Sequence, residues 1–209
     1  MTFVGSALSG TRLYAATGGA QNGVSVRNPI TLAEITSFTL PFAVEGVVAG
    51  DDDDLFIVSG ANVFHYSTDG VELDSQVDST TGRAFADIAF IADPRNPAAG
   101  SILAIDAAGG DSVSIRDAET LTGAGSFDVL AAATGITLGG SDDVYLAAGD
   151  TLLRYGTDGA FIESVTNDGA VYNDVAFVDG DLIVATTDGI SVRDPVTVSY
   201  THLTLPTKA

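Results

Sequence analysis

The chain of 209 residues contains no cysteine, a single lysine at Lys208, and no long apolar run. The missing cysteines exclude disulfide bonds and thiolate metal sites. A helix that crosses a membrane needs about 18 or more apolar residues in succession, so no membrane-spanning segment is predicted. The first residues lack the charged and apolar segments of a secretory signal peptide, and none is visible.

Positive charge is also scarce. Lys and Arg number 8 against 28 Asp and Glu, for a formal net charge of −20 at pH 7. A surface of this sign repels nucleic acid and anionic lipid, so neither is expected as a partner. Most of the acids are Asp in turn-like surroundings, which indicates a solvated acidic coat suited to salty surroundings or export. We therefore expect an extracytoplasmic or secreted protein; the alternative is that part of the coat binds calcium.

Hydrophobic residues make up 45% of the chain, and an internal duplication organises them. Residues 46–90 and 135–177 repeat one pattern, shown by Asp54–Ile57 against Asp143–Leu146 and by Thr68–Gly70 against Thr157–Gly159. A second pattern recurs as Ser25–Asn28, Ser114–Asp117 and Ser191–Asp194. The two patterns alternate, and each unit is about 44 residues long, a period that indicates a repeat architecture.

Each unit divides into four short apolar segments separated by Gly, Asn, Asp or Pro, which predicts four strands. Asp69-Gly70 between two of them predicts a type I′ hairpin. Four-stranded units at this period are typical of a β-propeller. We therefore predict an all-β fold, a propeller of four-stranded antiparallel blades with about five blades present. The blades are predicted at residues 2–41, 42–80, 84–130, 131–169 and 170–197.

The repeat motifs resemble those of a known group of propellers. The series Asp174–Phe177 (DVAF), Leu182–Ala185 (LIVA) and Ser191–Pro195 (SVRDP) is similar to bacterial propellers of the YVTN and NHL type. This resemblance covers residues 3 to 197 and implies the fold without an activity. Residues 198–209 (VSYTHLTLPTKA) resemble instead a tail of translated sequencing-adapter DNA on metagenomic reading frames. We expect this tail to be non-native and the chain to be a truncated propeller of about six to eight blades.

Polar side chains stand where the predicted inner strands begin, next to the central channel of a propeller. Glu45 and Asn173 precede two of these strands, and Asp87 and Asp174 lie at strand starts. Their oxygens suit calcium, which takes about six to eight oxygen ligands. They resemble residues that hold one water-activating divalent ion in gluconolactonase and senescence-marker propellers. The open alternative is that Asp87 and Asp174 accept backbone N–H bonds at the strand starts.

Two positions depart from that resemblance, because Ala86 and Thr134 fall where further ligands would be wanted. The run Asp51–Asp54 lacks the spacing of an EF-hand, so it indicates a solvated turn, with weak surface calcium binding as the alternative.

Arginines recur at the end of the third strand of alternate units, as Arg27, Arg116 and Arg193. They indicate either an anion-binding ring or structural pairing with a nearby Asp, such as the neighbour in the turn. The only histidines are His65 and His202. The repeat places Arg154 where His65 stands, which indicates an exposed position for a long polar group. No Gly-x-Ser-x-Gly elbow, phosphate loop or dinucleotide motif accompanies them.

No set of acid, base, nucleophile or complete metal ring emerges from these residues. We therefore predict a non-catalytic binding or scaffold module for a protein or glycan, without a cofactor. The alternative is a calcium-dependent, lactonase-like hydrolase with Glu45 and Asn173 as ligands and an Asp as base. An open blade edge would also favour self-association.

Overall fold

The structure is a computed structural model that describes residues 2–9, 12–18, 22–51, 54–78, 84–93, 95–107, 111–140, 143–166, 170–198 and 200–201. The described residues form strands and turns, with no helix among them. The described residues therefore contain no helix long and apolar enough to cross a membrane. His202 and the rest of the predicted tail beyond Thr201 lie outside the described residues.

The strands form five four-stranded antiparallel sheets, each made of strands consecutive in the sequence. Blade 1 contains β1 (Thr2–Ser9), β2 (Arg12–Gly18), β3 (Gly23–Arg27) and β4 (Glu34–Thr39). Blade 2 contains β5 (Gly46–Ala49), β6 (Asp54–Ser59), β7 (Asn62–Ser67) and β8 (Glu72–Val77). Blade 3 contains β9 (Phe85–Ile91), β10 (Ser101–Asp106), β11 (Ser112–Asp117) and β12 (Gly123–Asp128). Blade 4 contains β13 (Gly135–Leu138), β14 (Asp143–Ala148), β15 (Thr151–Gly156) and β16 (Phe161–Thr166). Blade 5 contains β17 (Tyr172–Val178), β18 (Asp181–Thr186), β19 (Gly189–Arg193) and the short β20 (Tyr200–Thr201).

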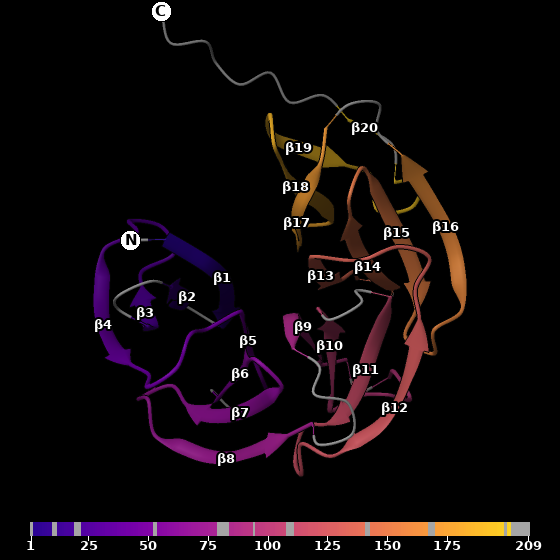
Figure 1. Ribbon diagram of the computed structural model, residues 1–209. Coiled ribbons are helices and arrows are strands. Elements are labelled where there is room, and N and C mark those ends of the chain that lie inside the picture. The colour runs from indigo at the N-terminus through magenta and orange to yellow at the C-terminus, as the bar shows by residue number, and fades with distance from the viewer. Residues whose placement is uncertain are drawn as a thin grey trace, which may run out of the picture.

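The sheets stand side by side around a common centre, as Figure 1 shows. The first strand of each sheet is innermost, and β1, β5, β9, β13 and β17 pack on one another in that order. The blades describe an arc, with blades 1 and 5 apart in the view of Figure 1. The predicted all-β propeller of four-stranded antiparallel blades is therefore confirmed.

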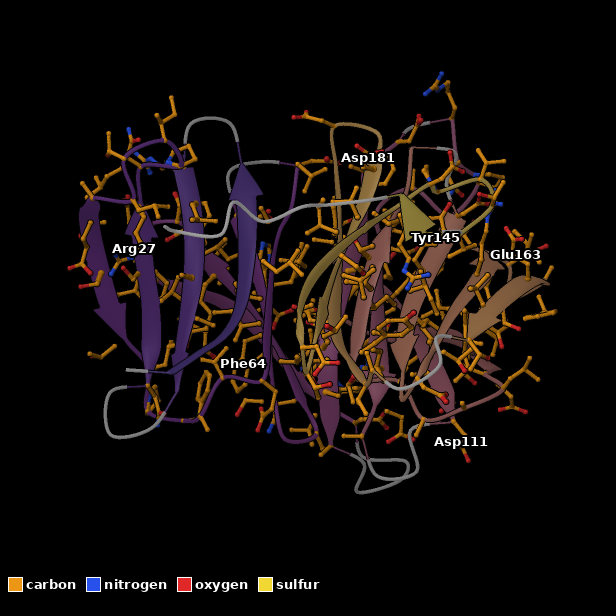
Figure 2. The ribbon with its side chains drawn as sticks, turned by 90° about the horizontal axis from the view of Figure 1, so that it is seen from above. Arg27, Phe64, Asp111, Tyr145, Glu163 and Asp181 are labelled. Atoms are coloured by element: carbon orange, nitrogen blue, oxygen red, sulfur yellow. The ribbon has the colours of Figure 1, made fainter. Side chains whose placement is uncertain are left out.

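Burial along the strands follows from this stacking. The second strand of an inner blade is covered on both faces by its neighbours, so every residue of β14 is buried. In β18 of the last blade, Leu182 and Val184 are buried while Ile183 and Ala185 are only partly covered. The fourth strand of a blade lies at the rim, and β8 is exposed along its whole length. The side-on view of Figure 2 shows Arg27, Tyr145, Glu163 and Asp181 toward one end of the strands, here called the upper face, and Asp111 toward the opposite, lower face.

The hairpin predicted at Asp69-Gly70 is present, but its predicted type is wrong. A type I′ turn needs positive φ at both central residues. Here Gly70 has φ of 82° while Asp69 does not adopt the left-handed region, and the strand register shifts between His65 and Tyr66. A Cβ on Gly70 would lie 2.5 Å from the Phe38 ring of blade 1. Packing of the turn on the preceding blade therefore requires the glycine, and Gly159 repeats the arrangement against Phe127.

Candidate functional site

A pocket of about 240 Å³ opens where the inner strands converge. Residues of β5, β9, β13 and β17 line it, and two of the predicted calcium ligands, Asp87 and Asp174, are among them. The repeat places these two aspartates at the same position of blades 3 and 5, so both carboxylates reach one pocket.

The Asp87 carboxylate connects three inner strands. Its Oδ2 accepts a hydrogen bond of 3.0 Å from the backbone N–H of Ile136 on β13. Its Oδ1 lies against Gly46 on β5, where a Cβ would approach it to 2.8 Å. Asp174 has a related position: its Oδ1 accepts 2.8 Å from the N–H of Val175. The sequence-based alternative, in which both aspartates accept backbone N–H bonds, is confirmed.

The two carboxylates also resist ionisation. Burial raises the pKa of Asp87 to about 8, and the negative charge of Asp174 contributes to the rise, against the N–H bonds from Ile136 and Ile88. Burial likewise raises the pKa of Asp174, which the N–H bond from Val175 partly offsets. At neutral pH, a pKa near 8 favours the neutral, protonated form of Asp87, which avoids a second negative charge beside Asp174.

The other two predicted ligands do not reach the pocket. The Oε2 atom of Glu45 accepts 2.9 Å from the N–H of Gly60 in the turn between β6 and β7. Asn173 is exposed, and its carbonyl accepts 3.1 Å from the Thr134 hydroxyl. Over the described ranges, no three His, Asp or Glu side chains gather in a way that could hold a metal ion. The structure thus brings together two of the four predicted ligands, short of the full oxygen set that calcium takes.

The recurring arginines support turns rather than present a ring of charge. Arg27, Arg116 and Arg193 each donate to a carbonyl five residues on, that of Leu32 (2.9 Å), Leu121 (3.0 Å) and Val198 (3.3 Å). Each acceptor residue has a positive φ between 53° and 57°, a conformation that costs free energy in a non-glycine residue. The guanidinium therefore stabilises a strained turn.

Pairing of an arginine with an Asp is confirmed for Arg116, but its partner is not the neighbour in the turn. Arg116 pairs with Asp78 of the preceding blade at 2.7 Å, and Arg27 pairs with Glu34. The turn neighbour Asp117 instead accepts from the N–H and hydroxyl of Thr120. Because Val198 is buried and takes the same turn position as Leu32 and Leu121, it packs as part of blade 5 although it opens the predicted tail.

Asp54 at the end of the acidic run and His65 also differ from expectation. Asp51 is exposed, as a solvated turn predicts, while Asp52 and Asp53 lie outside the described residues. Asp54 is largely buried and pairs with His65 at 2.5 Å. The His65 side chain is only 19% exposed and stacks on Phe56, so the exposure predicted for this position is wrong.

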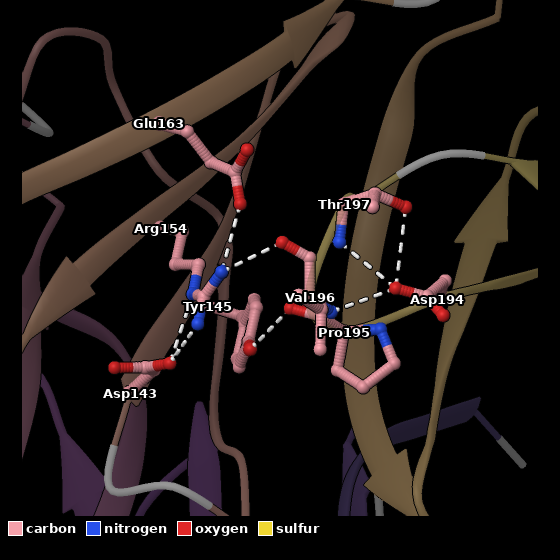
Figure 3. A network of polar contacts seen from close by, with 8 residues as sticks. All are labelled: Asp143, Tyr145, Arg154, Glu163, Asp194, Pro195, Val196 and Thr197. Carbon is pink, nitrogen blue, oxygen red and sulfur yellow. Dashed lines mark hydrogen bonds and ion pairs between the residues drawn. The ribbon is translucent and has the colours of Figure 1, made fainter.

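A polar joint between blades 4 and 5, not predicted from the sequence, is shown in Figure 3. Arg154 donates to Asp143 (2.8 Å from Nε), to Glu163 (2.8 Å) and to the carbonyl of Val196 in blade 5 (2.8 Å). Its guanidinium lies 5.8 Å from the centre of the Tyr145 ring, whose hydroxyl donates to the carbonyl of Pro195 (2.6 Å). The one signal in the sequence is that opposite charges face each other across neighbouring strands. The contact between blades has no such signal.

The comparisons with known proteins support the propeller fold and show no activity. No known protein family matches the chain, and no curated protein sequence does. A protein of unknown function from Bacteroides caccae has a similar structure, with a TM-score of 0.66 and 15% identity over 92% of this chain and 72% of that one. The Neurospora crassa Pan2 WD40 domain is similar with a TM-score of 0.70 and 11% identity, over 96% of this chain and 64% of that one. The WD40 β-propeller domain of Doa1 is similar with a TM-score of 0.68 and 11% identity, over 90% and 61%. The chain thus spans less than two thirds of either WD40 domain, and at these identities the likeness shows the propeller fold alone.

Proposed function

We propose that this chain is a non-catalytic module that binds a protein partner. The main support is the use of its channel carboxylates: Asp87 accepts the N–H of Ile136 and packs on Gly46, so it serves the contact between blades. Glu45 is likewise occupied by its own blade. The resemblance of the repeats to YVTN and NHL propellers and the structural likeness to WD40 domains agree with a scaffold role.

A selection of random peptides displayed on phage tests this proposal. It is run against the immobilised chain at roughly 0.15 M salt, where attraction between exposed charges is screened beyond about 8 Å. A binding module enriches a defined motif, and the free chain competes for the enriched peptides. The proposal would be contradicted if the selection enriched only polycationic peptides without a common motif, because any acidic surface attracts such peptides.

One observation favours a second candidate, a calcium-dependent hydrolase. Asp87 and Asp174 line one pocket, and the charge of Asp174 opposes ionisation of Asp87; a divalent cation bound between them would favour the ionised form of both. Such a protein would gain thermal stability in millimolar calcium and lose it in chelator, because a ligand that binds only the folded state stabilises it.

The binding proposal predicts the opposite for calcium. We expect the melting temperature to be the same with calcium and with chelator, and a lactone to be hydrolysed at the uncatalysed rate. Glu45→Gln and Asn173→Ala should leave any calcium response unchanged, since neither side chain lines the pocket. A calcium-induced rise in melting temperature that Asp87→Asn removes would favour the hydrolase instead.

A further inference from the structure

The joint between blades 4 and 5 has a counterpart between blades 2 and 3. Blades 2 and 4 repeat one pattern, so Asp54, Phe56 and His65 stand where blade 4 has Asp143, Tyr145 and Arg154. Asp74 lies across the strand pair from His65 as Glu163 lies across from Arg154. On the facing blades, Ala118 and Glu119 follow Arg116-Asp117 as Pro195 and Val196 follow Arg193-Asp194.

The two joints differ in what fills them. Between blades 4 and 5, Tyr145 and Arg154 donate to the carbonyls of Pro195 and Val196. Between blades 2 and 3, Phe56 has no hydroxyl, and His65 is shorter than arginine and bonds Asp54. Within the described part of blade 2, no side chain donates to the carbonyl of Ala118 or Glu119. A pocket of about 540 Å³ opens there instead.

The lining of this pocket suits a planar cation. Phe90, Phe56 and His65 form a stacked series, with ring centres 5.5 Å and 4.7 Å apart. The acids Asp51, Asp117 and Glu119 stand around it. Aromatic faces and carboxylates together attract a guanidinium, which stacks on the rings and donates to carboxylates and carbonyls in its plane. In the corresponding joint, the guanidinium of Arg154 meets groups of the same kinds: a carboxylate, a backbone carbonyl and an aromatic ring (Figure 3).

We propose that the pocket between blades 2 and 3 receives an arginine side chain of a partner protein. The guanidinium takes the place that the Nη1 end of Arg154 takes between blades 4 and 5, donating to the carbonyl of Glu119 and to the surrounding acids. This inference rests on the proposed binding function and adds to it the position of the contact and the chemistry of the partner. The net charge of −20 favours encounter with a cationic partner surface.

The test uses a short peptide with one arginine, acetyl-Gly-Arg-Gly-amide, titrated into the isotopically labelled full chain and followed by NMR. The control peptide carries citrulline, which has nearly the shape of arginine without its charge. We expect saturable shifts of the backbone amides of Gly100, Ala118 and Glu119 with the arginine peptide, and affinity at least about ten-fold weaker with citrulline, as loss of charge-assisted hydrogen bonds implies.

Two variants locate the binding. His65→Arg places an arginine where blade 4 has Arg154, so the chain should fill its own pocket; peptide binding is lost while the fold, followed by circular dichroism, is kept. Asp128→Asn is the control, because it removes one charge far from the pocket and should bind the peptide like the parent chain. Asp128 ends β12, and the N–H of the next residue, Val129, donates to the carbonyl of Asp111, which lies toward the lower face. The comparison separates a local site from general attraction to an acidic surface.

Equal affinity for the two peptides, no binding at millimolar peptide, or undiminished binding by His65→Arg would each overturn the inference. None of these outcomes touches the broader proposal. If displayed peptides yield a motif without arginine, the chain is a binding module whose contact lies elsewhere. If they yield no motif, the binding function fails first.

Discussion

At the scale of single residues, the glycine that opens the inner strand of an even-numbered blade is fixed by the aspartate of the next blade. A Cβ on Gly135 would lie 2.5 Å from Asp174 Oδ1 and 2.7 Å from its Cα, too close for either to stay in place. We expect Gly135→Ala to lower the free energy of unfolding by about 1–3 kcal/mol, as overpacking does.

Urea unfolding followed by circular dichroism measures this change. Gly123→Ala is the matched control, because a Cβ there meets nothing within 4 Å. That control should be neutral or stabilising by up to about 1 kcal/mol, since alanine narrows the unfolded ensemble. If the two variants unfold at the same urea concentration, the contact with Asp174 does not matter.

The raised pKa of Asp87 makes stability depend on pH in a definite direction. Its pKa of about 8 in the folded chain lies above the ordinary value of 3.8, so between these pH values the folded state holds a proton that the unfolded state has lost. Stability contributed by this group therefore falls as pH rises from about 4 to about 8. Asp87→Asn should remove this part of the pH dependence while its amide oxygen still accepts the N–H of Ile136.

Melting temperatures of the parent and of Asp87→Asn at pH 5 and pH 8 give the comparison. The variant should gain at pH 8 relative to pH 5, at roughly 2–4 °C for each kcal/mol in a domain of this size. A constant difference between the two proteins at both pH values would show that Asp87 is ionised in the folded chain.

At the scale of elements, the joint made by β14 and β15 with blade 5 should contribute more to the free energy of unfolding than an exposed ion pair does. The Arg154 side chain is 15% exposed and Asp143 12%, so Arg154→Met would remove a largely buried ion pair together with the hydrogen bonds to Glu163 and Val196. We expect a loss of about 3–5 kcal/mol in the free energy of unfolding.

Arg95→Met tests whether burial is the reason. Arg95 also pairs with an aspartate, Asp93, but its side chain is 85% exposed, so its removal should cost much less stability than the removal of Arg154. Both variants are compared by urea unfolding. Similar losses for the two would show that burial of the Arg154 pair adds nothing.

The elements themselves could be predicted from the sequence, because turns rich in Gly and Asp separate short apolar segments at a regular period. Contacts between elements could not. Gly70 was expected in a type I′ turn from its neighbour Asp69, whereas packing against Phe38, 32 positions earlier, determines the turn. The partner of Arg116 is Asp78 of another blade, and no local pattern points to it.

The candidate site shows the same division. The repeat places Asp87 and Asp174 at the channel, since the first strands of blades 2 to 5 converge there. The direction of a side chain just before such a strand depends on local hydrogen bonds, and Glu45 turns to the N–H of Gly60. Position within the repeat was therefore predictable, while side-chain direction was not.

At the scale of the whole molecule, the outer face of blade 5 determines how copies of the chain behave together. Ile183, Ala185, Ile190 and Val192 lie on the side of β18 and β19 away from the buried Leu182 and Val184, and Ile190 is 56% exposed. An apolar sheet face of this kind favours association with another copy, against the repulsion of a net charge of −20.

We expect sedimentation velocity to show reversible self-association that grows with protein concentration and with salt, because salt screens the repulsion. Ile190→Lys should reduce the association although it lowers the net negative charge, whereas Ile30→Lys, at a turn residue that is 90% exposed, should slightly increase it through charge alone. A monomer at all concentrations, or equal behaviour of the two variants, would remove this face as the site of contact.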